Sequence, residues 1–234
     1  MKISILTLFP EMFSGPFDHS IIKRAIEKKL IDIKLINIRN FGIGTHKTVD
    51  DKPYGGGVGM VLRVDVLEEA IRSTKEKTTH LAGVSAKRAE RAQKVILLDP
   101  RGTPFNQKKA KDFSKLKHLI LVCGHYEGVD ERINKFIDEK VSIGNFIVTG
   151  GEIPSMLIVD SVTRLVKDVL KKEAVQNESF SLSAEYLEHP HYTKPRVYKN
   201  LKVPKILLSG DHKKIMLWRK KRGRRTSGKT LLTI

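Results

Sequence analysis

The order of apolar patterns in the first forty residues constrains the fold of this chain most strongly. Residues 2–8 alternate between apolar and polar side chains as a strand does, and residues 21–30 then place apolar side chains at helical spacing. The strand-like alternation returns at residues 31–35. A strand, a helix and a second strand in this order predict a parallel βαβ unit, and therefore an α/β fold.

Later segments extend the same pattern. Residues 95–98 and 119–122 are short, wholly apolar runs, which predict strands buried on both faces. The single cysteine, Cys123, follows the second run and is predicted to lie in the core. Asn106 is placed to cap a lysine-rich helix that ends near Leu116, and a longer helix is predicted over residues 154–170, with a proline in its first turn.

The chain is predicted to contain two domains and a connection between them. Residues 1–170 carry the α/β pattern, residues 171–186 are polar and form a linker, and residues 187–234 form a short C-terminal domain. Within that domain Asp211 is placed to cap a helix. Residues 73–93 combine charged and small residues with little apolar periodicity, so they are predicted to be a mobile loop.

The charge of the chain indicates what it binds. Lys and Arg number 44 against 26 Asp and Glu, a formal net charge of +18. A field of this strength suits a polyanion, with nucleic acid first, and a soluble basic protein without such a partner is the alternative on charge alone. No apolar run approaches the roughly 20 residues that span a bilayer, and the first residue leads directly into a strand pattern. We therefore expect a cytoplasmic protein without a membrane partner.

Three segments could hold a ligand. Residues 54–59 are a glycine-rich loop that lacks the Gly-Lys-Ser/Thr ending of a P-loop, and a plain turn is the alternative. Residues 123–132 begin where a predicted buried strand ends, the usual place for ligands in open α/β sheets. There Glu127 could bind a ligand or be an ordinary carboxylate of a first helical turn. Residues 142–154 contain glycines that would permit close approach to an adenine-sized ring, although a glycine-rich strand end without a ligand has the same pattern.

The remaining candidate groups allow fewer interpretations. Arg164 lies in an apolar helical stretch, where a cation needs either an anionic ligand or a structural ion pair. His189 and His191 flank a proline, and no histidine pair has the spacing typical of a metal site, so no metal site is predicted. A Gly-x-Ser-x-Gly elbow is absent from the sequence, which leaves a hydrolase without support.

Several blocks, taken in order, resemble one family, the bacterial tRNA (guanine-N1)-methyltransferases of the SPOUT class. Each block alone is weak evidence for the family, whereas the order in which they occur is specific. The resemblance covers nearly the whole chain up to about Arg219. The blocks that carry the resemblance are residues 9–13, 48–57, 123–132, 142–154, 160–164 and 189–195.

The resemblance implies a SPOUT-type parallel sheet with a deep trefoil knot, a small and mainly helical C-terminal domain that binds tRNA, and an obligate homodimer. It implies S-adenosylmethionine as the methyl donor, and leaves Mg²⁺ open as a further cofactor. The substrate-binding positions that it implies are Asp50, Gly55, Gly57 and Gly59. The cofactor-binding positions that it implies are Leu98, Asp99, Pro100, Gly124, Glu127, Ser142, Ile143, Gly144, Asn145, Phe146, Ile147, Val148, Gly150, Gly151 and Pro154.

The implied activity is methylation of guanine N1 at position 37 of tRNA, where the guanine follows another guanine; DNA is not an expected partner. This nitrogen carries a proton, so a carboxylate must remove it while a cation steadies the charge that develops on O6. By resemblance the cation is Arg164. The family's base is typically an aspartate before a Ser-Phe or Ser-His pair, and here Glu178 precedes Ser179 and Phe180. We therefore predict Glu178 as the base.

The sequence departs from the family at three further points. Phe146 stands where a tyrosine is common, Asn145 replaces a frequent aspartate, and the tail after Arg219 is short and very basic. Because a glutamate stands where the family has an aspartate as its base, a catalytically silent RNA-binding protein of the same fold is the alternative. A SPOUT methyltransferase that acts on rRNA is a second alternative, and residues 50–59 argue against it.

Overall fold

The computed structural model describes residues 1–75 and 92–225, and for the last two of these the backbone alone. The chain divides into two compact units, residues 1–170 and 171–234. Helix α2 (Val64–Thr74) and strand β5 (Gln93–Pro104) include the two ends of the predicted mobile loop at 73–93. Residues 76–91 of that loop lie outside the described residues. No helix in the described part of the chain is long and apolar enough to cross a membrane.

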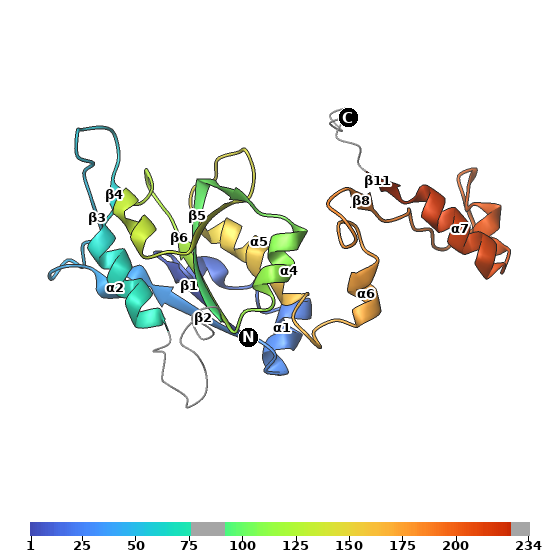
Figure 1. Cartoon of the computed structure of the whole chain (residues 1–234), viewed down its shortest axis with the longest axis horizontal. Helices are drawn as coiled ribbons and strands as arrows, with labels where there is room; N and C mark the ends of the chain where they lie inside the picture. The colour runs from blue at the N-terminus through green and yellow to red at the C-terminus, as the bar shows by residue number, and fades with distance from the viewer. Residues whose placement is uncertain (76–91, 226–234) are drawn as a thin grey trace. The chain divides into compact units, whose positions relative to one another are not determined.

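The first unit is built on a five-stranded sheet (Figure 1). All neighbouring strands pair in parallel, in the order β2-β1-β6-β5-β7. Helix α1 (Ser20–Glu27) connects β1 to β2, which is the predicted βαβ unit. The parallel α/β fold is therefore confirmed. Besides β5, the strands are β1 (Lys2–Thr7), β2 (Asp32–Asn37), β6 (His118–Cys123) and β7 (Glu139–Ser142).

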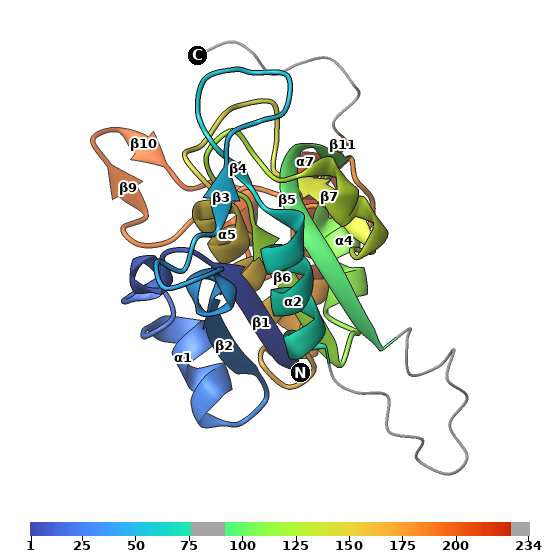
Figure 2. The same cartoon turned by 90° about the vertical axis from the view of Figure 1, so that its left-hand side faces the viewer.

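Both faces of the sheet are covered, because neighbouring residues of a strand point to opposite sides. Leu121 joins one hydrophobic cluster and Ile120 joins the other. Figure 2 shows α2 on the near face, where it packs with the short helices η2 (Ile38–Phe41) and η3 (Glu131–Lys135). The opposite cluster includes Cys123, which is fully buried as predicted, and burial raises the pKa of its thiol well above the ordinary value. That cluster is covered by η1 (Pro10–Phe13), α1, α4 (Gln107–Phe113) and α5 (Glu152–Thr163).

The helix boundaries partly follow the sequence signals. The side chain of Asn106 accepts a hydrogen bond of 3.0 Å from the Lys109 backbone N–H, so the predicted cap of α4 is confirmed. The helix predicted over residues 154–170 is wrong at its end, because α5 stops at Thr163. The Leu165 N–H then bonds three residues back to Val162, and Asp168 takes a positive φ of 68°. The apolar pattern continues past α5 because these turns still pack against the core.

Strand β5 pairs with β7 in two successive stretches. Val141 of β7 pairs with Leu98 and again with Thr103, and the residues between them form an irregular bend. A Cβ atom on Gly102 would collide with the backbone of Val141, so the bend requires glycine at this point. Beyond it the Phe105 N–H donates a 2.7 Å hydrogen bond to the Ser142 carbonyl. This bend places residues 98–101 at the end of the sheet where the pocket described below is found.

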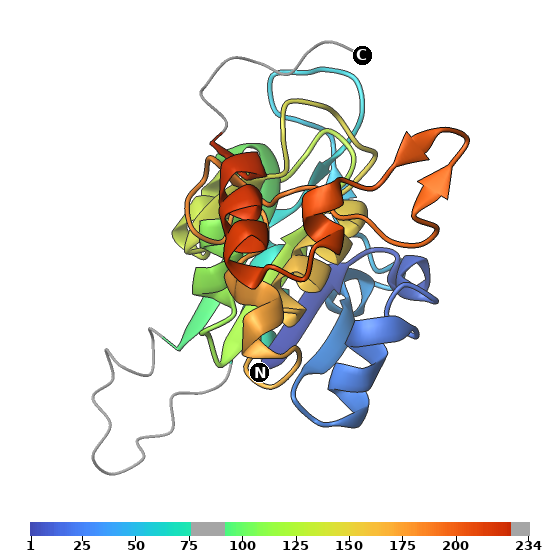
Figure 3. The same ribbon diagram turned by 90° about the vertical axis from the view of Figure 1, so that its right-hand side faces the viewer.

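The second unit consists of short elements (Figure 3). The Asp211 side chain accepts a hydrogen bond of 3.0 Å from the Lys214 N–H, which confirms the predicted helix cap. A short helix, α6, lies within the predicted linker at 171–186. The elements are α6 (Lys172–Gln176), β8 (Tyr186–Leu187), β9 (Val197–Tyr198), β10 (Leu201–Lys202), η4 (Lys205–Leu208), α7 (His212–Arg222) and β11 (Arg224–Arg225).

Candidate active site

A pocket of about 520 Å³ opens at the carboxyl ends of β5, β6 and β7. Its walls are residues 98–101 at the bend of β5, residues 124–129 after β6, and residues 141–144 and 146–151 at and after the end of β7. Figure 2 shows the loops that follow β6 and β7 gathered at one end of the sheet. Ligands of α/β proteins bind at this edge, and the volume is typical of small-molecule sites.

The cofactor positions predicted from the resemblance converge on this pocket. Every one of them lines it except Asn145, which lies between two lining residues but is not part of the wall. Sequence reasoning missed several other lining residues, although they belong to the same loops. Proximity to the predicted positions was the one signal for these residues, which include Arg101, His125, Tyr126, Glu131 and Thr149.

Two adjacent glycines let the pocket loops approach each other at backbone distance. The Gly151 N–H donates a 2.8 Å hydrogen bond to the Gly124 carbonyl. A Cβ atom on Gly151 would lie 2.6 Å from the Cα atom of Cys123, closer than real side chains come. At Gly150 it would lie 2.5 Å from Nδ1 of His125. At these two positions the pocket wall therefore has backbone where other residues would place a side chain.

A buried acid ties three elements together beside the pocket. Glu152 is 1% exposed, at the start of α5, where the helix dipole favours a negative charge. One of its oxygens accepts a 2.7 Å hydrogen bond from the Thr7 hydroxyl of β1, and the other lies 3.8 Å from His125 Nδ1. The His125 ring packs against Phe9 and Tyr126, with ring centroids 4.9 Å away in each case. The β6 loop is thus fixed against β1 and α5.

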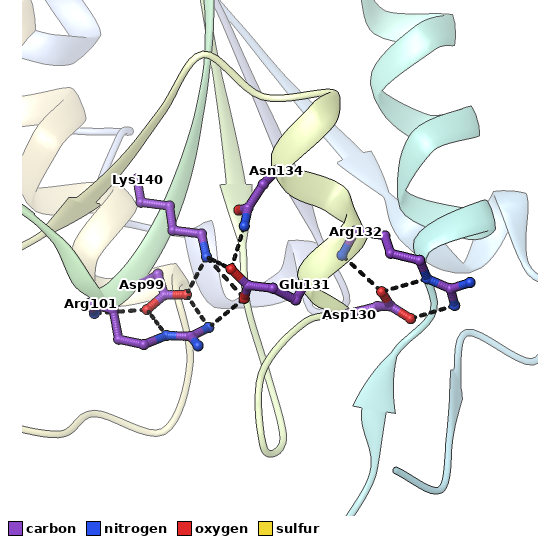
Figure 4. Close-up of polar contacts among 7 residues, drawn as sticks. All are labelled: Asp99, Arg101, Asp130, Glu131, Arg132, Asn134 and Lys140. Carbon is purple, nitrogen blue, oxygen red and sulfur yellow. Dashed lines mark hydrogen bonds and ion pairs between the residues drawn. The ribbon is translucent and has the colours of Figure 1, made fainter. Parts of the chain in front are cut away.

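A network of charged side chains forms part of the pocket rim (Figure 4). Arg101 lies 3.0 Å from the Asp99 carboxylate and 3.2 Å from that of Glu131, and Lys140 also lies 3.2 Å from Glu131. These residues come from β5, η3 and β7, so the network joins three walls. Partial burial acts to raise the pKa of Asp99, but hydrogen bonds from Arg101 and the positive charges of Arg101 and Lys140 outweigh it and lower the pKa. Asp99 is therefore held as a carboxylate.

The glycine-rich loop at 54–59 joins β3 (Asp50–Asp51) to β4 (Val61–Leu62), with Asp50 opposite Leu62. One predicted substrate residue of this loop contacts the pocket: a Cβ atom on Gly59 would lie 2.5 Å from Cγ of Glu127. Gly55 and Gly57 have φ values of +85° and +134°, which only glycine adopts readily, and they do not line the pocket. The loop therefore borders the pocket wall through Gly59.

The two predicted catalytic residues belong to different units. Arg164 caps the carboxyl end of α5 and is partly exposed in the first unit. Glu178 follows α6 in the second unit, where it is also partly exposed. Its carbonyl accepts a 2.6 Å hydrogen bond from the Ser181 hydroxyl, and the Phe180 N–H donates one of 2.6 Å to the Tyr186 carbonyl. A tight turn thus fixes the backbone that carries Glu178.

A parallel sheet covered on both faces, with a glycine-lined pocket at the carboxyl ends of its strands, defines an α/β protein with a pocket of the size and position that suit a small ligand. The chain belongs to the tRNA (Guanine-1)-methyltransferase TrmD family, whose model matches residues 1–231. The resemblance inferred from the ordered motifs is confirmed.

Three relatives show the same kinship, and each is named tRNA (guanine-N(1)-)-methyltransferase. The protein of Carboxydothermus hydrogenoformans is 51% identical over 222 residues, which are 94% of this chain and 82% of that relative. The Dictyoglomus turgidum protein is 49% identical, over 94% of this chain and 84% of its own length. The Bacillus subtilis protein is 48% identical, over 94% and 86% respectively.

Proposed function

We propose that this chain transfers a methyl group from S-adenosylmethionine to N1 of the guanine at position 37 of tRNA, where that guanine follows another guanine. The observation that carries the proposal is the family match over residues 1–231. The net charge of +18 suits a tRNA substrate, because phosphate contacts supply most of the affinity for nucleic acids. We propose the second unit, with its basic helix α7, as a tRNA-binding domain.

The pocket residues fit S-adenosylmethionine. Glycine is required at position 151, where a side chain would collide with the backbone of Cys123 and Gly124, and backbone groups of the loops that line the pocket can bind an adenine edge. Leu98, Ile147 and Pro154 supply apolar surface for the ring. The carboxylate of Glu127 suits an ammonium or hydroxyl group. When bound, the donor supplies a methyl group on a positively charged sulfur.

The remaining chemistry belongs to Glu178 and Arg164. Guanine N1 carries a proton and is a poor nucleophile, so the Glu178 carboxylate accepts this proton as the bond between N1 and the methyl carbon forms. The negative charge that develops as this proton leaves N1 is shared with O6, where the Arg164 guanidinium stabilises it until the methyl group is transferred. A glutamate can do this work in place of an aspartate because its carboxylate has nearly the same basicity and one more methylene of reach.

Single-turnover methylation of a tRNA transcript tests this assignment. We expect Glu178→Gln to lower the rate by about 10²- to 10⁴-fold while leaving S-adenosylmethionine binding unchanged, because the amide cannot accept the proton. Glu185→Gln, at an exposed acid of the same segment, is the matched control and should retain the rate. A near-normal rate for Glu178→Gln would reject it as the base. No methylation by the unmodified enzyme on a guanine-37 transcript would reject the reaction itself.

We also propose that the first unit contains the trefoil knot of the SPOUT class. The double pairing of Val141 with Leu98 and Thr103 supports it, because the β5 segment stays against β7 on both sides of its bend. The close approach of Gly151 to Cys123 supports it further, since the chain returns from the β7 edge to the end of β6 before α5 begins.

A homodimer is the third part of the proposal. Helix α5 is apolar over most of its surface, yet Ile153 and Leu157 are 51% and 44% exposed, one turn apart. Phe146 and Ile147 in the preceding loop are 57% and 84% exposed. A helix that is apolar all round is normally buried, and a second copy of the chain would cover these side chains.

A further inference from the structure

Three metal-binding side chains gather in the second unit. Glu188, His189 and His191 each offer a ligand atom, and these atoms all lie within 4.8 Å of one another. The two imidazole rings have centroids 4.7 Å apart, and Oε1 of Glu188 lies 3.2 Å from Nε2 of His191. The spacing of the two histidines does not predict a metal site, and sequence pattern alone does not group them with Glu188.

The proline explains how the two histidines come together. A residue before proline is restricted to extended backbone, and in extended backbone side chains two positions apart point to the same side. His189 and His191 are separated by Pro190 alone, so both rings face the same side of the segment.

The segment is anchored at its amino end and through the ring of His189. The β8 strand, which ends at Leu187, pairs with β11, and the Glu188 N–H donates a 3.0 Å hydrogen bond to the Ser179 hydroxyl. On the other side, the His189 ring packs edge-on against Trp218 of α7, with centroids 6.3 Å apart. These contacts hold the ligand-bearing backbone in place, so little ordering is required on binding.

The donor set selects a class of ion. Two imidazole nitrogens and one carboxylate are ligands typical of Zn²⁺ and other first-row transition metals, whereas Mg²⁺ prefers oxygen ligands alone. Ligand atoms around Zn²⁺ lie roughly 3 to 4 Å apart, so small side-chain rotations bring these three into range. The Glu188 carboxylate offsets part of the added charge. His191, 69% exposed, leaves room for a water ligand.

We propose that Glu188, His189 and His191 bind a divalent first-row transition metal ion, with Zn²⁺ as the natural candidate. These residues do not belong to the cofactor pocket, and binding of the ion does not depend on methyl transfer. Failure of metal binding would therefore leave the proposed methyl transfer intact, and failure of methyl transfer would leave the metal site intact.

Cobalt titration of the untagged, full-length protein tests the site after treatment with a chelator. We expect one Co²⁺ per chain, visible absorption bands of a four- or five-coordinate ion, and loss of those bands when Zn²⁺ is added. His191→Ala and Glu188→Gln should weaken binding at least about 10-fold, because each removes one of three protein ligands. His212→Ala is the matched control, since it removes an exposed histidine of the same unit that lies outside the cluster.

A second measurement guards against variants that fail to fold. Zn²⁺ should raise the Tm of the unmodified protein and of His212→Ala, but not that of His191→Ala or of the milder His191→Gln, because an ion stabilises only the folded state that binds it. The proposal is overturned by an absence of saturable Co²⁺ binding, by equal binding in His191→Ala and His212→Ala, or by displacement of Co²⁺ by an equal concentration of Mg²⁺.

Discussion

The two units of the chain differ sharply in how much of their surface they bury. The first contains both hydrophobic clusters and a sheet of five strands. In the second, none of the side chains described between residues 171 and 223 is buried, and each strand is two residues long. The first unit therefore has the layered core that lets a domain hold its shape, whereas the described residues of the second bury too little apolar surface to do so in the same way.

The two units also have different roles in the proposed reaction. The proposed cofactor pocket is already formed in the first unit by glycine contacts and the rim network, so a small ligand can bind without much reorganisation. Glu178 belongs to the unit in which no described side chain is buried. We expect that unit to gain order as a whole on contact with tRNA, as weakly packed segments do when they bind a large partner, while the locally bonded turns that carry Glu178 and the two histidines keep their backbone.

The largest effect should follow from removing the second unit. A chain of residues 1–170 should keep its α/β fold and bind S-adenosylmethionine within about threefold of the full-length affinity, because the pocket residues all lie within it. Methylation of tRNA should fall to background, at least about 10³-fold, because the base and the basic helix are lost. Calorimetry and a methylation assay on the same preparation measure both. Loss of cofactor binding by the short chain would show that the pocket depends on the second unit.

The next largest effect should follow from adding a side chain where two loops of the pocket wall meet. Gly151→Ala places a Cβ atom 2.6 Å from the Cα atom of Cys123 and 2.9 Å from the Gly124 nitrogen, so the two loops must move apart. We expect S-adenosylmethionine binding to weaken by about 100-fold, or about 2.7 kcal/mol, measured by calorimetry.

Gly15→Ala is the control for this substitution. Gly15 has a φ of +95° and no atom within 4 Å of an added Cβ, so the variant bears backbone strain of about 1 kcal/mol without a collision. It should bind the cofactor normally. Equal S-adenosylmethionine binding by the Gly151→Ala and unmodified proteins would show that the two loops can move apart without cost to the cofactor site.

The sequence predicted those features that depend on short-range pattern. The βαβ order, the caps at Asn106 and Asp211 and the burial of Cys123 each follow from residues that lie close together in the chain. The end of α5 could not be found in this way, because Leu165 and Val166 pack on the core from turns as helical residues would.

Contacts between distant segments were not predictable from pattern at all. The bend that lets Val141 pair twice depends on Gly102 meeting the backbone of a strand almost forty residues away. The rim network joins side chains of three elements, and nothing in the spacing of Asp99, Glu131 and Lys140 indicates that they meet. The pocket positions themselves came from the resemblance to a family rather than from periodicity.

The smallest effect concerns that rim network and its dependence on pH. The folded-state pKa of Asp99 is lowered, since hydrogen bonds and charge from Arg101 overcome the effect of burial. A lowered pKa contributes stability above the ordinary pKa of aspartate, and this contribution is lost as the pH falls through the folded-state value. At neutral pH, Asp99→Asn should therefore lower the free energy of unfolding by about 0.5 to 1 kcal/mol, a small amount because solvent screens the pair.

Urea unfolding at a series of pH values measures this difference. The gap between Asp99→Asn and the unmodified protein should be constant near neutrality and shrink below a pH of about 4, where the free aspartate takes up its proton. Asp32→Asn, at an exposed acid at the start of β2, is the matched control. A gap that persisted unchanged in acid would show that Asp99 stabilises the bend through packing. The rim would then resemble the rest of the first unit, where buried contacts rather than charge hold the chain in place.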